Sequence, residues 1–431
     1  MELFKKIAGK ITGRVYDAAK ETQKNIAGEA YQELSQIDIL KMVSLARRAF
    51  ANNGFVRDIV AANDIYSVGD GIFADPATND ENWNLAAKEY FKKWSRNIAT
   101  GTTLTLAEAT SIVSRRIDVD GEVFIIKHLL DGTPRLQFLE SQNIDLSQND
   151  SETNTIQGIS FNNWGEPTRY FFKNDSQNTI VDAQTVIHVF FKETFSSIHG
   201  IPQIQHALSS IGATNDIFKA VLANAKVQQG VAMILQSEQG KAFGAKDLLG
   251  EWQANSPDAN AIIAQTVPGE LLESFKKTDP NQDVLNALTL LDRRSCGGVL
   301  PPDFFDPSKI GGASTRLITS KAARHFGRRQ TLLIDHFLKP VWAFVIANAM
   351  ENGHLPENEE FLSVEWNCPK SITVDAGREW NADFQAVQAG LISETTFYAE
   401  RGIDGKAEMQ RALKDKAARE ALAKSLNINQ A

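Results

Sequence analysis

The opening part of the chain carries apolar residues at the spacing of amphipathic helices. The pattern covers residues 36–66, 83–94 and 106–118, with Thr103 or Thr105 placed to cap the last helix. Residues 1–35 are more polar, and they fit either a weakly amphipathic arm that packs on a neighbour or a partly disordered tail. The start of the chain is therefore predicted to be all-helical.

The apolar pattern changes to a period of two between about residue 120 and residue 195. Asp131-Gly132 is a hairpin turn signal between two β-rich runs. Strands are expected at residues 123–126, 135–139, 156–161, 168–172 and 186–191. Together they predict one small, mostly antiparallel sheet behind the helices.

A long helix follows, in which apolar residues alternate spacings of four and three. We expect it to begin at Pro202, because proline favours the first position of a helix. Five residues form what we call the α-seam, and they are Leu208, Ile211, Asn215, Phe218 and Leu222. A narrow seam of this kind favours packing against another long helix, with Asn215 setting the register. An ordinary amphipathic core helix has the same pattern, so both interpretations stay open.

Residues 231–279 predict a compact α/β insert after this helix. Strands are expected at 231–235, 261–264 and 271–272, with a helix near 246–254 between them. A second helix, 281–295, then returns. Two long helices with a small insert between them predict a helical hairpin that carries a domain at its tip.

A Gly/Ser-rich loop, Asp306 to Ser314, separates this hairpin from a long helix over residues 315–339. The first half of the long helix is basic, with Arg316, Lys321, Arg324, Arg328 and Arg329. Such a run fits a solvated face, an ion-pair partner of another subunit, or, with Lys309, a face that meets phosphates. We expect Pro340 to kink or restart the helix. A strand at 361–366 and further helices from about residue 375 complete the chain.

This order of elements predicts an α+β, mostly helical multi-domain protein with small antiparallel sheets. The 431 residues fit two or three domains, and 42% of them are apolar. The two cysteines, Cys296 and Cys368, cannot make a disulfide framework. The N-terminus has no secretory h-region, and the most apolar window, residues 341–350, is about half a membrane span, so we expect no transmembrane helix and no membrane partner.

The net charge of −8 argues against tight binding to a nucleic-acid backbone. The same charge is compatible with a protein past which DNA slides without sticking. The acidic balance therefore excludes a conventional nucleic-acid binder but not a DNA conduit.

Candidate chemistry is missing from the sequence. Gly402 to Lys406 lacks the upstream glycine of a phosphate-binding loop, and no nucleophile-elbow motif occurs. His199 and His206 are seven residues apart and straddle a helix start, which is poor metal-ligand spacing. Asp303 and Asp306 fit helix caps better than a metal site. We therefore expect no catalytic residue, no metal and no cofactor.

Several stretches together resemble the portal proteins of tailed bacteriophages, and most of all the lambda-type branch. They are Arg47 to Val60 followed by Val68-Gly-Asp-Gly-Ile72, Trp94 with Arg115 to Glu122, Asn163 to Pro167, and Val186 to Phe190 leading to His199-Gly-Ile-Pro202. Their order and spacing carry the resemblance, which spans about residues 40–350. The chain departs from the branch at Glu193 to Ile198, where an arginine-rich stretch is usual, and it is also short for the branch.

The resemblance implies a portal fold and a ring of about twelve subunits. The implied segments are an N-terminal arm (1–35), a wing (36–200), stem helix 1 (201–230), a clip (231–279), stem helix 2 (280–300), a tunnel loop (301–314), a long kinked helix with a wing strand (315–370), and a crown (371–431). In this map the α-seam packs stem against stem. The residues expected to line the DNA channel are Ser308, Lys309, Ile310, Arg316 and Arg324.

The resemblance also implies a location and partners. The ring would sit at one capsid vertex of the virion, after assembly in the host cytoplasm, and double-stranded DNA would be packaged and ejected through it. The implied protein partners are further copies of the chain, the terminase, the major capsid or scaffolding protein, and a head-completion adaptor. Two alternatives are another ring component of the head–tail connector, for which 431 residues are long, and a nucleic-acid-processing enzyme, which would need a phosphate-binding loop or clustered acidic ligands.

Overall fold

The structure is a computed structural model. It describes residues 36–173, 178–229, 233–236, 263–266, 282–295, 300, 302–305, 311–369, 372, 376–399 and 405–425. The chain divides into two compact units, one made of Met1–Gln205 with Val299–Ala431 and the other of His206–Gly298. Each unit is described by itself. The arm expected at residues 1–35 lies outside the described residues.

The first unit opens with the expected helices, α2 (Gln36–Asn52), α3 (Gly54–Ser67), α4 (Glu81–Trp94) and α5 (Leu106–Val119). The break between α2 and α3 falls at Asn53, whose side chain accepts a hydrogen bond from the Val56 amide at 3.0 Å. Thr105 caps α5 in a reciprocal capping box with Glu108. These helix predictions are confirmed, and both starts come from capping residues visible in the sequence.

The predicted hairpin after α5 is also confirmed. Strands β2 (Glu122–Leu130) and β3 (Thr133–Glu140) are antiparallel, and Asp131 and Gly132 between them both have positive φ, 50° and 74°. Two such residues make the primed turn that matches the twist of a hairpin. Strand β8 (Val186–Phe190) pairs with the other edge of β2, so this three-stranded sheet has the order β3-β2-β8.

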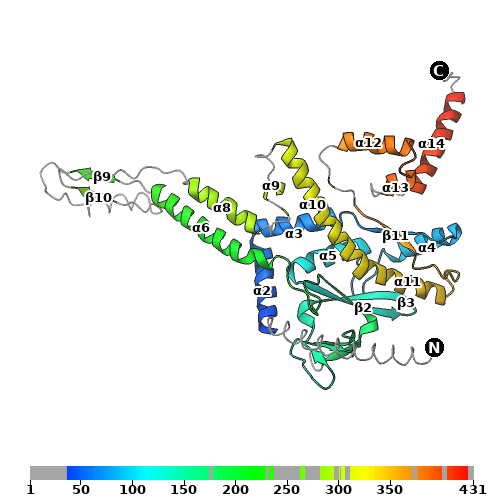
Figure 1. Cartoon of the computed structure of the whole chain (residues 1–431), viewed down its shortest axis with the longest axis horizontal. Helices are drawn as coiled ribbons and strands as arrows, with labels where there is room; N and C mark the ends of the chain where they lie inside the picture. Colours follow the sequence, from blue (N-terminus) through cyan, green and yellow to red (C-terminus); the bar gives the residue numbers. More distant parts are fainter. Residues whose placement is uncertain are drawn as a thin grey trace, which may run out of the picture. The chain divides into compact units, whose positions relative to one another are not determined.

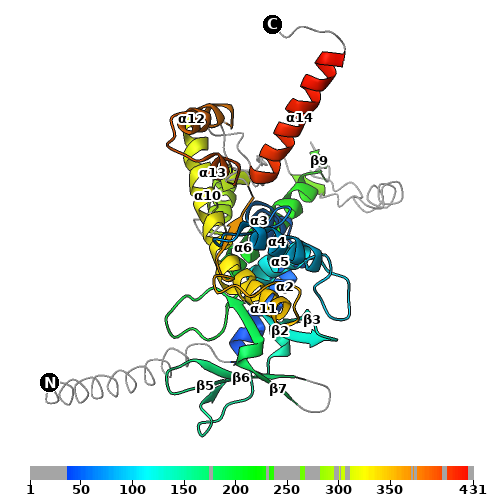
Figure 2. The same cartoon turned by 90° about the vertical axis from the view of Figure 1, so that its right-hand side faces the viewer.

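The expectation of a single sheet is wrong, because a second sheet forms. Its strands, seen in part in Figure 2, are β4 (Thr155–Ile156), β5 (Ile159–Phe161), β6 (Pro167–Phe172) and β7 (Thr179–Asp182). The reason lies in β2, which is buried on both faces. Val123 and Ile125 enter one hydrophobic core, whereas Phe124 and Ile126 enter another with Tyr170 of the second sheet.

The long helix is interrupted by a wider turn. It consists of α10 (Gly312–Leu333), the π-helical segment η4 (Ile334–Leu338) and α11 (Lys339–Glu351). The amide of Lys339 donates to the Ile334 carbonyl, five residues back. Pro340 lies in the first turn of α11, so the expected restart is confirmed. The helix begins at Gly312 rather than Thr315, because Gly311 is its N-cap and accepts the Thr315 amide at 3.1 Å.

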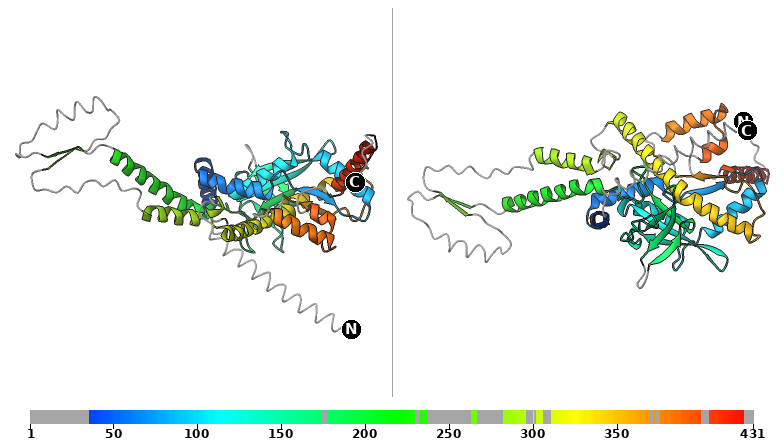
Figure 3. Two further views of the ribbon diagram at one scale, coloured as in Figure 1. Left: turned by 90° about the horizontal axis from the view of Figure 1, so that it is seen from above. Right: turned by 60° about the horizontal axis from the view of Figure 1, so that its bottom comes forward.

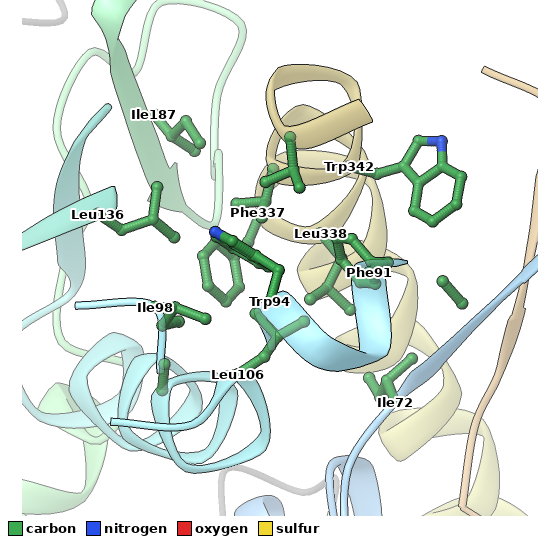
Figure 4. Close-up of a cluster of buried hydrophobic side chains, with 14 of the residues drawn as sticks. Ile72, Phe91, Trp94, Ile98, Leu106, Leu136, Ile187, Phe337, Leu338 and Trp342 are labelled. Carbon is green, nitrogen blue, oxygen red and sulfur yellow. The ribbon is translucent and has the colours of Figure 1, made fainter. Parts of the chain in front are cut away.

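The η4–α11 part of this helix supplies the centre of the main core. Phe337, Leu338 and Trp342 are fully buried. In Figure 4 the Phe337 ring lies beside Trp94 and Leu136, and the Trp342 ring packs on Phe91 with 4.9 Å between the ring centroids. By length and composition alone, the helical run Ser314–Glu351 is long and apolar enough to cross a membrane, but 56% of its apolar window is buried inside the protein. Such burial is typical of a core helix.

Two further features close the first unit. Strand β11 (Val364–Asn367) pairs antiparallel with β1 (Phe73–Pro76), which shortens the strand expected at 361–366. In the described part of the unit, the further α-helices are α9 (Pro302–Phe305), α12 (Ala376–Gln388), α13 (Glu394–Ala399) and α14 (Gly405–Ser425), labelled in Figure 1. The helices expected after residue 375 are thus confirmed.

The second unit contains α6 (Gln205–Gln229), β9 (Met233–Gln236), β10 (Ile263–Thr266) and α8 (Gln282–Ser295). Strands β9 and β10 pair in parallel, and Figure 3 shows α6 and α8 leading to and from them. Helix α6 starts three residues later than expected, because the Ile204 amide donates to the Asp118 carbonyl at 3.3 Å instead of starting the helix. The helix expected near 246–254 and the strand at 271–272 lie outside the described residues.

Candidate functional site

The first half of α10 presents a row of cations, which we call the cationic face. Its members are exposed, and they are Arg316, Lys321, Arg324 and Arg328. The opposite side of the helix is buried through Ala322, Phe326 and Leu333. Arg316 and Arg324 therefore lie on an exposed face, as channel-lining residues would need to, whereas Ser308, Lys309 and Ile310 lie outside the described residues.

Arg329, the fifth member of the basic run, is not on this face. It is only 3% exposed, and its guanidinium donates two hydrogen bonds to the Asp118 carboxylate, at 2.7 and 3.2 Å. It also donates to the backbone and side-chain oxygens of Ser114, at 3.0 and 3.1 Å. Burial raises the pKa of Asp118, and Arg329 opposes that rise. Arg329 thus ties α10 to α5 and is unavailable to a ligand.

His325 adds no charge to the cationic face at neutral pH. Its Nε2 lies 2.9 Å from the Asn63 side-chain oxygen. Burial, followed by the neighbouring charges of Arg329 and Arg328, lowers the pKa of His325 to about 4. The side chain of Arg328 in turn lies over the Phe191 ring, with 5.8 Å between the guanidinium carbon and the ring centroid.

The α-seam on α6 divides into two parts. Ile211 is 6% exposed and Leu208 is half-buried, whereas Phe218 and Leu222 are 51% and 58% exposed. The side chain of Asn215 lies outside what the structure describes. The first part of the α-seam is therefore covered within one chain, and the second part presents two large apolar side chains to the outside.

Sequence reasoning missed a row of buried carboxylates at the end of α5. Asp118, Asp120 and Glu122 are each at most 1% exposed, and each has a basic partner from another part of the chain. Asp118 pairs with Arg329, and Asp120 pairs with Arg47 of α2 at 2.7 Å. Alternating acidic residues at the end of an apolar helix were the signal that could have identified this row.

The third carboxylate, Glu122, meets His188 and His199. Among the described residues, these three form the one group of side chains whose ligand atoms lie close enough to hold a metal ion, within 4.8 Å of one another. In the sequence, His199 was a candidate metal ligand only together with His206, which is exposed in the structure. The structure instead places His199 beside a glutamate 77 residues away.

Comparisons with solved structures give distant similarities. The neck of an empty GTA (gene transfer agent) particle computed with C6 symmetry is 14% identical, with a TM-score of 0.48, and the match covers 84% of this chain and 93% of that one. The neck of a native GTA particle computed with C12 symmetry is 15% identical, also with a TM-score of 0.48, and covers 82% and 91%. An HK97 family phage portal protein from Corynebacterium diphtheriae is 12% identical, with a TM-score of 0.34, and covers 78% and 94%.

A search of curated proteins returned no match. The family comparison is decisive, because the model for "Phage portal protein, lambda family" matches residues 20–286. The matched region contains α2 to α6, the β3-β2-β8 and β4-β5-β6-β7 sheets, the buried carboxylate row and the α-seam. The chain therefore belongs to the lambda family of phage portal proteins.

Proposed function

We propose that about twelve copies of this chain form a closed ring at one vertex of the capsid, and that double-stranded DNA is packaged and ejected through its centre. Membership of the portal family supplies the general role, a structural channel at the capsid vertex that serves DNA packaging. The ring number, the surfaces that build the ring, and the residues that meet DNA are our proposal. We assign no catalytic step to the chain.

The exposed part of the α-seam is the observation that carries the ring. Phe218 and Leu222 occupy successive a/d positions, and more than half of each side chain is exposed. Burying one such side chain contributes about 1.5–3 kcal/mol. A cyclic ring repeats this gain at every interface, so neighbouring copies of α6 and α8 are the partners that the α-seam fits.

The cationic face of α10 supports a channel role. Arg316 and Arg324 are exposed on the helix that follows the 301–314 tunnel loop, and we place both, with Ser308, Lys309 and Ile310, at the bore. A few arginines in a chain with a net charge of −8 would position DNA without holding it firmly. The alternative role of the cationic face is to form ion pairs with carboxylates of a neighbouring subunit instead of contacting DNA.

The remaining segments are assigned by the family map. We propose residues 1–35 as an arm, 36–200 as the wing, 201–230 and 280–300 as the stem, 231–279 as the clip, 301–314 as the tunnel loop, 315–370 as the long helix with the wing strand, and 371–431 as the crown. The clip is the proposed docking site of the terminase and later of the head-completion adaptor. The outer parts would meet the capsid or scaffolding protein.

Leu222→Asp tests the ring. The charge should leave the chain folded, because the side chain is already exposed, and it should prevent assembly because a carboxylate would be buried between stems. Ala220→Asp is the matched control, since Ala220 is exposed on the opposite side of the same helix. Particle mass should show rings for Ala220→Asp and monomers for Leu222→Asp. Rings of unchanged mass for Leu222→Asp would refute the assignment of the α-seam.

Arg316→Glu combined with Arg324→Glu tests the channel. Rings should still assemble, and the amount of DNA packaged per particle should fall, because two charges per subunit are reversed along the bore. Lys414→Glu on α14 is an exposed control that should package normally. Normal packaging by the double variant would refute the assignment of the cationic face of α10 to the bore.

A further inference from the structure

The cluster around Glu122 joins three parts of the first unit. Glu122 begins β2, His188 lies on the adjacent strand β8, and His199 belongs to the segment that leads into α6. All three side chains are buried, with side-chain exposures of 1%, 7% and 4%. The cluster is independent of the channel and ring surfaces, and nothing assigned so far to the protein uses it.

The hydrogen bonds fix the protonation state of His199. Its Nδ1 lies 3.0 Å from both Glu122 oxygens, and its Nε2 lies 3.0 Å from the backbone carbonyl of Gln157. A backbone carbonyl only accepts hydrogen bonds, and so does an ionised carboxylate. Both ring nitrogens of His199 must therefore carry a proton, which makes the ring an imidazolium cation.

His188 is the neutral member. Its Nε2 donates to Glu122 at 2.9 Å, and its ring stacks on Phe124 and Phe190 with centroid distances of 4.2 and 4.3 Å. Burial lowers the pKa of His188, and burial together with Glu122 raises that of Tyr170. The buried site thus holds one negative and one positive charge, on Glu122 and His199.

The ion pair holds the chain that leads into α6. The Gly200 amide donates to Oε2 of Glu122 at 2.9 Å, the oxygen that also accepts the hydrogen bond from His188. Gly200 lies against Gly121, so closely that a Cβ at Gly200 would meet the Gly121 carbonyl oxygen at 2.1 Å. The attachment of residues 199–204 therefore depends on a charge, in addition to backbone contact.

We propose that Glu122 and His199 form a proton-controlled latch, which fastens residues 199–204 to the end of α5 and the start of β2 and loosens when His199 loses its proton. The titratable or charged groups that face the latch are Glu122 from β2, Tyr170 from β6, His188 from β8, Lys192 after β8 and His199 itself. The charge of Lys192 is one of the smaller causes that lower the pKa of His188, after burial. Glu122 is the one carboxyl group among them.

The direction of the pH effect follows from the two ion-pair partners. Glu122 raises the pKa of His199 above its ordinary value of 6.5, in spite of the burial of the ring. The latch is then fully closed below pH 6.5 and opens as the pH rises from 6.5 to the higher pKa of the closed state. Glu122 is ionised in the closed latch: burial alone would raise its pKa, but the charge of His199 and the hydrogen bonds from both histidines lower it to about 2.

A bound metal ion is the competing explanation of the cluster. Zinc bonds of about 2.0–2.1 Å would hold two ligand atoms about 3.3 Å apart in a tetrahedral site. The contacts of Glu122 with the two histidines are 2.9 and 3.0 Å, the lengths of direct hydrogen bonds. The Gly200 amide, a donor, points at the same oxygen, which also favours protons over a cation.

The test uses the full-length protein as it assembles. Exchange of the histidine C2 proton, followed by mass spectrometry, reports the pKa of each imidazole, and backbone amide exchange reports protection of residues 199–204. We expect His199 to titrate above pH 6.5 and His188 below it. Protection of residues 199–204, corrected for the intrinsic pH dependence of exchange, should fall by up to about tenfold per pH unit between 6.5 and the pKa of His199.

Glu122→Gln keeps the shape of the side chain and removes its charge. It should lower the pKa of His199 and abolish the pH dependence of protection, whereas Glu140→Gln, at a half-exposed carboxylate of β3, should change neither. Two results in the unsubstituted protein overturn the proposal, even if Glu122→Gln fails to fold. One is a His199 pKa at or below 6.5, and the other is amide protection of residues 199–204 that does not change as His199 titrates. One equivalent of zinc in the purified protein, with loss of protection on chelation, overturns it in favour of a metal site.

Discussion

Replacing Arg329 with methionine should destabilise the first unit strongly. Methionine fills much of the same space, but it leaves the Asp118 carboxylate, which is fully buried, without its cation. Breaking a buried ion pair in this way costs about 3–5 kcal/mol. Asp118 would retain one hydrogen bond, from the Asn63 amide at 3.0 Å, so we expect a loss near the lower end of this range.

Urea unfolding of the unassembled chain, followed by tryptophan fluorescence, measures this loss, because Trp94 of α4 and Trp342 of α11 lie in the main core. Arg324→Met is the matched control, and as an exposed substitution it should change the free energy of unfolding by no more than about 0.5 kcal/mol. The double variant Asp118→Leu with Arg329→Met should be more stable than Arg329→Met alone, since no charge is left buried. Equal stability of Arg329→Met and Arg324→Met would refute the buried ion pair.

Two further predictions concern stability. Gly200→Ala should lower the free energy of unfolding by about 1–3 kcal/mol or more, because the new Cβ would overlap the Gly121 carbonyl oxygen. Gly212→Ala, whose Cβ would have nothing within 4 Å, should instead stabilise α6 by about 0.5–1 kcal/mol. Thermal unfolding that ranks the two variants in the opposite order would contradict the close contact at Gly200. The half-buried His325 is kept neutral, with its pKa lowered to about 4, so its contribution to stability is present above pH 6.5 and is lost as the pH falls toward 4. Substituting His325→Gln, which can still bond Asn63, should remove up to about 3 kcal/mol of that acid sensitivity, as measured by urea unfolding at pH 7 and pH 4.

Local signals in the sequence predicted the elements well. Thr105, as one of two candidates, marked a helix cap and Asp131-Gly132 marked a hairpin turn, and the structure confirms both. Each depends on interactions between residues a few positions apart. The long-range pairing of β1 with β11 was not predicted, because no local pattern specifies a partner nearly 300 residues away.

The charged residues were harder to interpret, because a charge alone does not say whether it is buried. Arg329 was read as part of an exposed basic run, yet it continues the buried positions Ala322, Phe326 and Leu333 at spacings of three and four. Its place in that apolar stripe was the available signal. The pairing of Glu122 with His199 offered no such signal, since the two residues come from segments 77 residues apart.

The π-helical turn before Pro340 sets the angular phase between the two halves of the long helix. An α-helix advances about 100° per residue, so removing one residue from Ile334–Leu338 would rotate the cationic face by that angle about the helix axis relative to Trp342. Trp342 and its neighbours are locked in the core and cannot rotate with it. Arg329 likewise holds α10 on Asp118, so a single inserted or deleted codon at this turn would set the anchor of α10 against that of α11.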